Sequence, residues 1–203
     1  MYAKDIFDAE YDYTNFSEDL NVYDVGWSWG AIFSDYNHDG FEDLYVANGF
    51  FTNERNIYFE NIQVGNNNTF EQGFFSDNVM SLQHTKSRSV NSFDYDNDGD
   101  LDLIFSIFDN DLNMWENTSV DNQYTDDIMG AWVKFNLEGS TSNKDGLGTI
   151  LEVQFEDGTK QIRHYNGSGY QHQSIQSTHF GGGENNTITT LKVKWPSSGE
   201  EIY

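Results

Sequence analysis

The sequence predicts an all-β protein, and three observations support that class. Apolar and polar residues alternate through many short segments, as in strands that bury one face. A unit that reads strand, acidic loop, strand, turn, strand occurs twice, starting at Asp35 and at Asp94. No segment carries the apolar stripe of an amphipathic helix. We therefore expect a partial β-propeller of about two blades over residues 1–127, followed by a small antiparallel β-sandwich or barrel over residues 128–203.

The strands of the first unit are read from its alternation. Ala31-Ile32-Phe33 leads into the first acidic loop, and Leu44-Tyr45-Val46 leaves it. A third strand is expected at Ile57 to Phe59 and a fourth from Asn67. The segment from Gly73 to Ser87 has weak periodicity, so we expect a long connection between the blades.

The second unit repeats this order. Leu103-Ile104-Phe105 leaves the second acidic loop, and Leu112 to Trp115 forms the next strand. In both units an aromatic third strand is followed by the pair Glu-Asn, at Glu60-Asn61 and at Glu116-Asn117. The repeat is therefore larger than the loop itself, and its length suits a propeller blade.

The pattern changes near Asp126-Asp127, where cleaner alternation begins. Asp157-Gly158 is a hairpin signal between two of the new strands, and Pro196 ends a later one. This pattern predicts the small antiparallel domain. Its inward positions are expected to be Val133, Phe135, Leu137, Leu151, Val153, Phe155, Leu191, Val193 and Trp195.

The two acidic loops have the spacing of a calcium site. They read DYNHDGFED over residues 35–43 and DYDNDGDLD over residues 94–102, with oxygen-bearing side chains at positions 1, 3, 5 and 9. Alternate residues of a tight loop can direct such oxygens at one hard cation, and glycine at position 6 permits the sharp turn. We expect two Ca²⁺ sites, with the position-7 residues Phe41 and Asp100 giving backbone carbonyls. The expected ligands are Asp35, Asn37, Asp39, Phe41 and Asp43 in the first loop, and Asp94, Asp96, Asp98, Asp100 and Asp102 in the second.

These loops differ from an EF-hand, which needs helical flanks and a bidentate Glu at position 12. Position 12 is Val46 in the first loop and Phe105 in the second, so Asp43 and Asp102 must close the sites. The second loop is expected to bind more tightly, because it has Asp96 where the first has the neutral Asn37.

Composition narrows the choice of partners. The chain has 203 residues, with 34 acidic against 10 basic ones and a net charge of −24, so nucleic acid and anionic membranes are unfavourable partners. It has no cysteine, which excludes disulfides and thiolate metal sites. No signal peptide or membrane-spanning run is visible.

Two further stretches carry a family resemblance. The strand-flanked acidic loops resemble FG-GAP/VCBS repeats, the blades of integrin-type β-propellers. The C-terminal segment resembles the ASPIC/UnbV domain that follows such repeats in cartilage acidic protein and in bacterial secreted proteins. The family usually has leucine after His-Phe-Gly, where this chain has Gly182. The matching positions are Gly146, Gly148, Arg163, Gly169-Tyr170, Gln173, His179-Phe180-Gly181 and Trp195-Pro196.

The resemblance implies a propeller of about seven blades and one more strand after Trp195-Pro196. We therefore expect a fragment of a longer exported protein that ends before that strand. The resemblance favours a calcium-stabilised extracellular binding or adhesion module without enzymatic activity, whose partner is a cell-surface protein or glycan. The alternative is a non-catalytic accessory region of a larger secreted glycan-degrading enzyme.

Other candidate sites favour structural roles. His38, His164, His172 and His179 lack the spacing of a zinc site, and no nucleophile motif or phosphate loop is present. Acidic pairs are too abundant for any one to indicate a glycosidase. An aromatic set is more typical of blade core than of a platform for sugars. This set is Trp27, Trp29, Tyr45, Tyr58 and Trp115.

Overall fold

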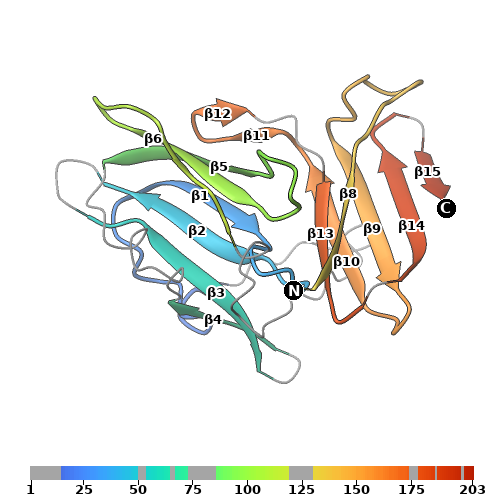
Figure 1. The fold of residues 1–203 in the computed structure, drawn as a ribbon, viewed down its shortest axis with the longest axis horizontal. Helices are drawn as coiled ribbons and strands as arrows, with labels where there is room; N and C mark the ends of the chain where they lie inside the picture. The colour runs from blue at the N-terminus through green and yellow to red at the C-terminus, as the bar shows by residue number, and fades with distance from the viewer. Residues whose placement is uncertain are drawn as a thin grey trace.

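The structure is a computed structural model that describes most of the chain and contains two groups of β-sheets (Figure 1). All regular elements within the described residues are strands, which confirms the all-β class. No helix in this part of the chain has the length and apolar character needed to cross a membrane. The described residues are 15–49, 54–64, 67–72, 86–118, 130–173, 178–185, 187–197 and 199–203.

The first blade is a four-stranded antiparallel sheet whose strands follow one another in sequence order. The fourth strand expected from Asn67 is present. The first acidic loop connects the first two strands. The strands are β1 (Ser28–Ser34), β2 (Asp43–Asn48), β3 (Ile57–Val64) and β4 (Asn67–Gln72).

The second blade has three described strands, β5 (Ser87–Phe93), β6 (Asp102–Ile107) and β7 (Asn113–Trp115), again in sequence order. The second acidic loop connects β5 and β6, so both units place the loop in the same position. The connection expected over residues 73–85 lies outside the described residues.

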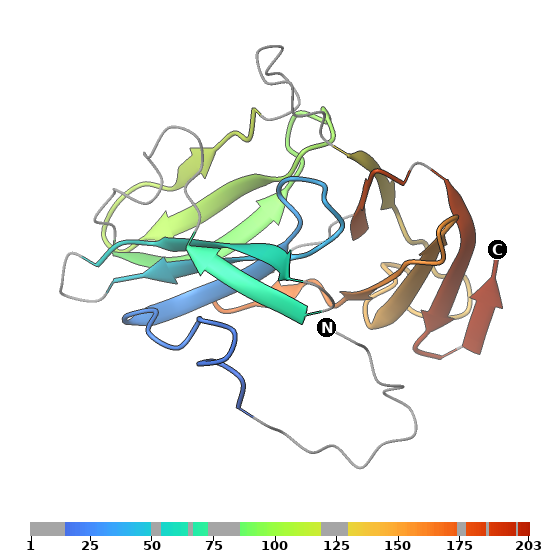
Figure 2. The ribbon, with the colours of Figure 1, turned by 90° about the horizontal axis from the view of Figure 1, so that it is seen from below.

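The two blades pack through their first strands, β1 and β5, which lie side by side (Figures 1 and 2). Gly30 makes the close approach possible, because a Cβ there would lie 3.1 Å from the Arg88 carbonyl oxygen and 3.2 Å from the Val90 nitrogen. The buried side chains between the blades alternate along their strands, as the sequence predicts. They are Tyr36, Tyr45, Ala47, Tyr58, Val90, Leu101, Leu103 and Phe105.

The outer face of the first blade is covered by the segment that precedes it. Leu20, Val22 and Val25 pack against buried side chains of β2, β3 and β4. This contact protects a second apolar face that two blades alone would leave open to water. The covered side chains are Leu44, Val46, Phe59 and Phe70.

The C-terminal domain consists of a four-stranded sheet in the order β10-β9-β14-β15 and a two-stranded sheet, β13-β8. Between them lie Leu151, Val153, Phe155, Tyr165 and Phe180, with Val133, Phe135, Leu137 and Leu191 packed around. The two sheets thus form an antiparallel sandwich, one of the two arrangements expected. The strands are β8 (Ala131–Phe135), β9 (Thr149–Phe155), β10 (Lys160–Tyr165), β13 (Thr178–Gly183), β14 (Ile188–Trp195) and β15 (Gly199–Ile202).

The strand β15 corrects one expectation from the sequence. We expected the chain to end before a further strand, but Gly199 to Ile202 pairs with the second half of β14. Glu200 stands opposite Lys194, a cross-strand pair of opposite charge that favours this register. The predicted domain boundary at 127/128 lies outside the described residues and stays a prediction.

A short hairpin links the two parts of the molecule. Its strands, β11 (Ser168–Gly169) and β12 (His172–Gln173), reach from the C-terminal domain to β5 of the second blade. Tyr170 in the hairpin turn stacks on Trp29 of β1, with ring centroids 5.8 Å apart. The C-terminal domain therefore packs against the blades through the β11–β12 hairpin and the stacking of Tyr170 on Trp29.

Candidate metal sites

Both acidic loops make the same backbone turn. In the first, position 4 (His38) and position 6 (Gly40) have left-handed backbone, with φ of 59° and 93°. In the second, Asn97 and Gly99 stand at the same positions, with φ of 65° and 106°. Left-handed backbone is free of strain for glycine but uncommon for a residue with a side chain, so its recurrence at His38 and Asn97 shows that the loop conformation requires it. The sequence repeat therefore corresponds to a repeated structure.

The position-9 aspartates are held identically in the two loops. The carboxylate of Asp43 accepts hydrogen bonds from the backbone nitrogens of Tyr36 (3.2 Å) and Asn61 (2.9 Å). The carboxylate of Asp102 accepts from those of Tyr95 and Asn117, both at 2.8 Å. Each aspartate thus ties position 2 of its loop to the asparagine of the Glu-Asn pair. The side-chain amides of Asn61 and Asn117 also donate to the position-8 carbonyls of Glu42 (3.1 Å) and Leu101 (3.4 Å), which gives a reason for asparagine to recur.

The first loop surrounds a buried carboxylate. Asp35 is 2% exposed, and its Oδ2 accepts a hydrogen bond from the Gly40 nitrogen at 3.0 Å. Its other oxygen, Oδ1, is buried and has no hydrogen-bond partner among the described residues. Asp39 accepts from the Phe41 nitrogen at 2.8 Å, and the Asn37 amide lies 3.3 Å from the same carboxylate. An oxygen buried without a partner is costly unless something absent from this structure pairs with it.

The carboxylates of the first loop carry unusual pKa values. Burial, with the nearby charge of Asp39, raises the pKa of Asp35 to about 8. Burial also raises the pKa of Asp43 to about 7 and raises the pKa of Asp39. These shifts show that the loop disfavours its own negative charge when no cation is present.

The second loop brings its carboxylates together. Ligand oxygens of Asp94, Asp96 and Asp102 lie within 4.8 Å of one another, and within the described residues no other three acidic or histidine side chains converge in this way. The side chain of Asp94 is only 4% exposed, and its Oδ1 has no partner among the described residues. Asp98 Oδ2 is likewise buried and unpartnered, and burial raises the pKa of Asp98.

These donor sets fit a hard cation. Every side chain at positions 1, 3, 5 and 9 offers oxygen, and oxygen ligands in a loop are what Ca²⁺ prefers. In the second loop, three of the predicted carboxylates lie close together, those of Asp94, Asp96 and Asp102. Asp98 is not part of that group. In the first loop the corresponding carboxylates are linked by charge, since Asp39 and Asp43 both raise the pKa of Asp35. The carbonyl ligands Phe41 and Asp100 stay predictions.

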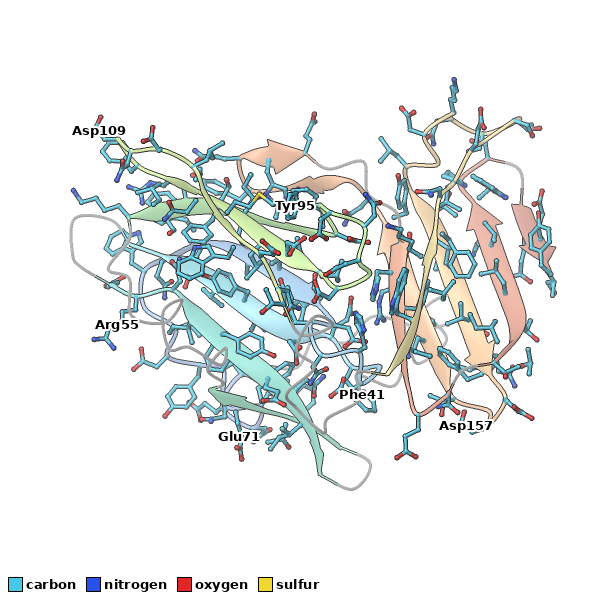
Figure 3. The ribbon with its side chains drawn as sticks, in the orientation of Figure 1. Phe41, Arg55, Glu71, Tyr95, Asp109 and Asp157 are labelled. Atoms are coloured by element: carbon cyan, nitrogen blue, oxygen red, sulfur yellow. The ribbon has the colours of Figure 1, made fainter. Side chains whose placement is uncertain are left out.

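Both loops face the C-terminal domain, a contact that the sequence analysis did not predict (Figure 1). Figure 3 labels Phe41 in the first loop and Tyr95 in the second. The Gly183 nitrogen donates to the His38 carbonyl at 2.8 Å, and Arg163 Nε lies 3.2 Å from Glu42 Oε1. The domain therefore contacts the first loop through both backbone and side chains.

Lys134 makes the corresponding contact with the second loop. Its ammonium lies 2.7 Å from Asp94 Oδ2 and 3.1 Å from Asn97 Oδ1. Nothing in the sequence near Lys134 signals this role, because the aspartate lies 40 residues away. The contact between Lys134 and Asp94 depends on how β8 packs against the second loop.

Two histidines lie between the loops and the C-terminal sheet. His38 and His179 are 0% and 9% exposed, their ring centroids are 4.9 Å apart, and Trp132 stacks on His179. Burial lowers the pKa of each to about 4, so both rings are neutral near pH 7. His179 Nε2 lies 3.0 Å from the Gly99 carbonyl oxygen. This arrangement fits the structural role expected for these residues.

The five aromatic residues considered as a sugar platform are not one surface. Tyr45 and Tyr58 are buried in the core between the blades, and Trp115 packs against that core. Trp27 is 55% exposed, whereas Trp29 is covered in part by Tyr170 and Arg88. The core interpretation therefore holds for the tyrosines and Trp115 but is wrong for Trp27.

Comparison with known families gives the class of the protein. Residues 35–105 match the FG-GAP-like repeat family. This range begins at position 1 of the first loop and ends in β6, so it spans both loops. This part of the chain is thus similar to FG-GAP-like repeats.

A second match completes the description. Residues 139–202 match the family described as ASPIC and UnbV, which covers β9 to β15. The chain therefore carries FG-GAP-like repeats followed by an ASPIC/UnbV domain, the order that the sequence resemblance implied. A search of curated proteins returned no match to this chain.

Proposed function

We propose that this chain is a calcium-stabilised extracellular binding or adhesion module without catalytic activity of its own. The observation that carries the proposal is the pair of loops with one turn geometry and with buried, unpartnered oxygens of Asp35, Asp94 and Asp98. Buried carboxylate oxygens need a cation or a hydrogen bond to offset their loss of water. A bound Ca²⁺ at each loop meets that need.

Calcium suits these loops better than the other common metals. The donors are all oxygens, with no cysteine and with both buried histidines turned to each other and to Trp132. Zinc and copper favour nitrogen or sulfur, and Mg²⁺ demands a stricter octahedron. Dissociation constants on the order of 10⁻⁴ to 10⁻³ M are expected, the range of extracellular calcium modules.

The absence of catalytic activity is proposed from the same loops. Catalysis by a metal needs an open coordination position that can hold water or substrate. Here the predicted shell is filled by the loop's own side chains and carbonyls, so each ion would hold structure. Such ions would also replace disulfides, which this cysteine-free chain cannot form. The proposed partner is a cell-surface protein or a glycan.

Calorimetric titration with calcium tests the proposal. The wild-type chain should bind two ions, and Asp39→Ala and Asp98→Ala should each bind one, because each variant loses the position-5 ligand of one loop. The double variant should bind none. Two ions in every variant would contradict the assignment of the sites, and no binding to the wild type would contradict the proposed function.

A further inference from the structure

We propose that Lys134 is an internal cation that competes with the metal ion of the second loop for Asp94. The proposal rests on the calcium site proposed above and adds a residue from outside the loop that sets its affinity. Lys134 belongs to β8 of the C-terminal domain, whereas Asp94 is position 1 of a loop in the second blade. Binding of the ion is therefore linked to the contact between the two domains.

The geometry of Lys134 supports competition. Its Nζ is 2.7 Å from Asp94 Oδ2, in the side-chain ion pair with the shortest separation among the described residues. The Asp94 side chain is 4% exposed and that of Lys134 is 24% exposed, so water screens this pair incompletely. The ammonium partly neutralises a carboxylate that the ion would need at full charge.

The other oxygen of Asp94 is available to an ion. Asp94 Oδ1 is buried without a partner among the described residues, and oxygens of Asp96 and Asp102 lie within 4.8 Å of the Asp94 ligand atom. An ion held there would stand a few ångströms from the ammonium. A divalent cation and an ammonium at such a separation repel each other, so each must weaken the other's binding.

The first loop provides an internal contrast. Its cationic neighbour is Arg163, which pairs with Glu42 at 3.2 Å. Glu42 stands at position 8 and is not among the predicted ligands, so Arg163 holds the domain on the loop without occupying a ligand carboxylate. Arg163 acts on Asp35 only through its charge, so among the described residues a direct ion pair with a predicted ligand is confined to the second loop.

The affinity of the second loop is measured in an Asp39→Ala background, where the first site is removed. Lys134→Met keeps the apolar stem and removes the charge, and it should lower the calcium dissociation constant about tenfold. Lys134→Arg should retain the parental constant, because the charge is kept. Arg163→Met in an Asp98→Ala background is the matched control and should tighten the first site much less, because Arg163 makes no ion pair with a predicted ligand.

A second measurement uses the unaltered chain. Binding of calcium should release Lys134 and make its amine react faster with an acetylating reagent, as followed by mass spectrometry. Lys160 and Lys192, which pair with Glu152 on the C-terminal sheet, are the controls and should not change. Protection of Lys134 that is the same with and without calcium would overturn the proposal.

The failures are distinguishable. A calcium constant that is the same in the Asp39→Ala parent and its Lys134→Met derivative contradicts the role of Lys134 and leaves the calcium site standing. No calcium binding in the wild type or any variant contradicts both proposals. Calcium binding that is absent from the Asp39→Ala parent and appears only in its Lys134→Met derivative supports competition in its strongest form.

Discussion

The two acidic loops share a sequence motif and a turn but have different surroundings. In the first, Asp35 and Asp43 are 2% and 0% exposed, and burial raises the pKa values of both. In the second, Tyr95 and Asp96 are exposed and three carboxylates converge beside the ammonium of Lys134. The first loop therefore holds buried carboxylates without an ammonium beside them, whereas the second combines the buried side chains of Asp94 and Asp102 with the exposed Asp96 and has the ammonium of Lys134 beside Asp94.

This difference shows that the sequence motif determines the backbone turn of the loop, whereas the packing around the loop determines the charge state of its carboxylates. Spacing determines the turn, since His38 and Asn97 adopt the same left-handed backbone in unlike surroundings. The charge state depends on what packs over the loop. The expectation that the second loop binds more tightly counted Asp96 against Asn37 but left out Lys134, which acts in the opposite direction. That expectation stays a prediction.

Removal of calcium should have the largest effect, because it acts on both loops. At a hundredfold excess over the dissociation constant, each ion contributes about 2.7 kcal/mol to the free energy of unfolding. Chelation should therefore lower the stability of the full chain by about 5 kcal/mol if both sites are filled. Urea unfolding with calcium and with a chelator measures this difference. Chelator should destabilise Asp39→Ala less than the wild type. An equal loss of stability in both would show that the first loop does not bind a stabilising calcium ion.

The pH dependence of the chelated form isolates the first loop. The folded pKa values of Asp35 and Asp43 are raised from 3.8 to about 8 and about 7, so the folded state holds protons that the unfolded state has lost. Stability without calcium should therefore fall as pH rises from about 6.5 to about 8. Below that range His38 and His179, whose pKa values burial lowers to about 4, act in the opposite direction. Asp35→Asn should remove most of this fall, and saturating calcium should abolish it, since the ion replaces the protons. A fall of the same size in Asp35→Asn would contradict the assignment to Asp35.

Gly181→Ala should damage the first loop selectively. A Cβ at this position would lie 2.0 Å from Asp35 Oδ2 and 2.7 Å from the His38 Cα. Overpacking of this kind costs about 1–3 kcal/mol, and it should displace a ligand of the first site. Calcium titration of Gly181→Ala should show a weaker first site and an unchanged second site.

Gly158→Ala is the control for that variant. It lies in the same domain and strains the backbone at φ +88°, but a Cβ there meets nothing within 4 Å. It should lower stability without changing either calcium constant. If both variants weaken the first site equally, general loss of stability explains the result and the steric contact with Asp35 does not.

Asn117→Ala should have a smaller effect, which tests the connection between the blades. The Asn117 side-chain amide donates to the Tyr36 carbonyl at 3.0 Å, joining the second blade to the first loop. Its counterpart Asn61 donates to the Glu42 carbonyl of its own unit at 3.1 Å. Loss of an amide that leaves a buried carbonyl unpaired costs about 1–3 kcal/mol, and the low end is expected here because Asn117 is only half-buried. Urea unfolding should show a larger loss for Asn117→Ala than for Asn61→Ala, and the reverse order would contradict the bridging role.

The strands were predictable because their signals are local. Alternation placed β2, β9 and β14, and Asp157-Gly158 placed the hairpin between β9 and β10, where Gly158 has φ of 88°. The repeated loops also predicted where the candidate ligands lie. These features depend on a few neighbouring residues, so one sequence is enough to find them.

The contacts between domains could not be predicted in the same way. His179 meets the Gly99 carbonyl across 80 positions, and Arg163 meets Glu42 from another domain. Such contacts depend on how two finished sheets dock, which no local pattern encodes. The Trp27 side chain was misjudged for a related reason: aromatic residues in a strand-rich segment are usually core, but this one precedes β1 and is exposed.

The smallest expected effect is the response of the two sites to salt. Exposed charges are screened within about 10 Å at 0.1 M ionic strength, whereas buried ones are screened much less. The second loop, with its exposed Asp96, should therefore lose calcium affinity a few-fold between about 0.05 M and about 0.5 M sodium chloride, and the first loop should lose less. The comparison uses Asp39→Ala for the second site and Asp98→Ala for the first. Equal salt slopes would show that the surroundings of the two loops do not control how their ions are held.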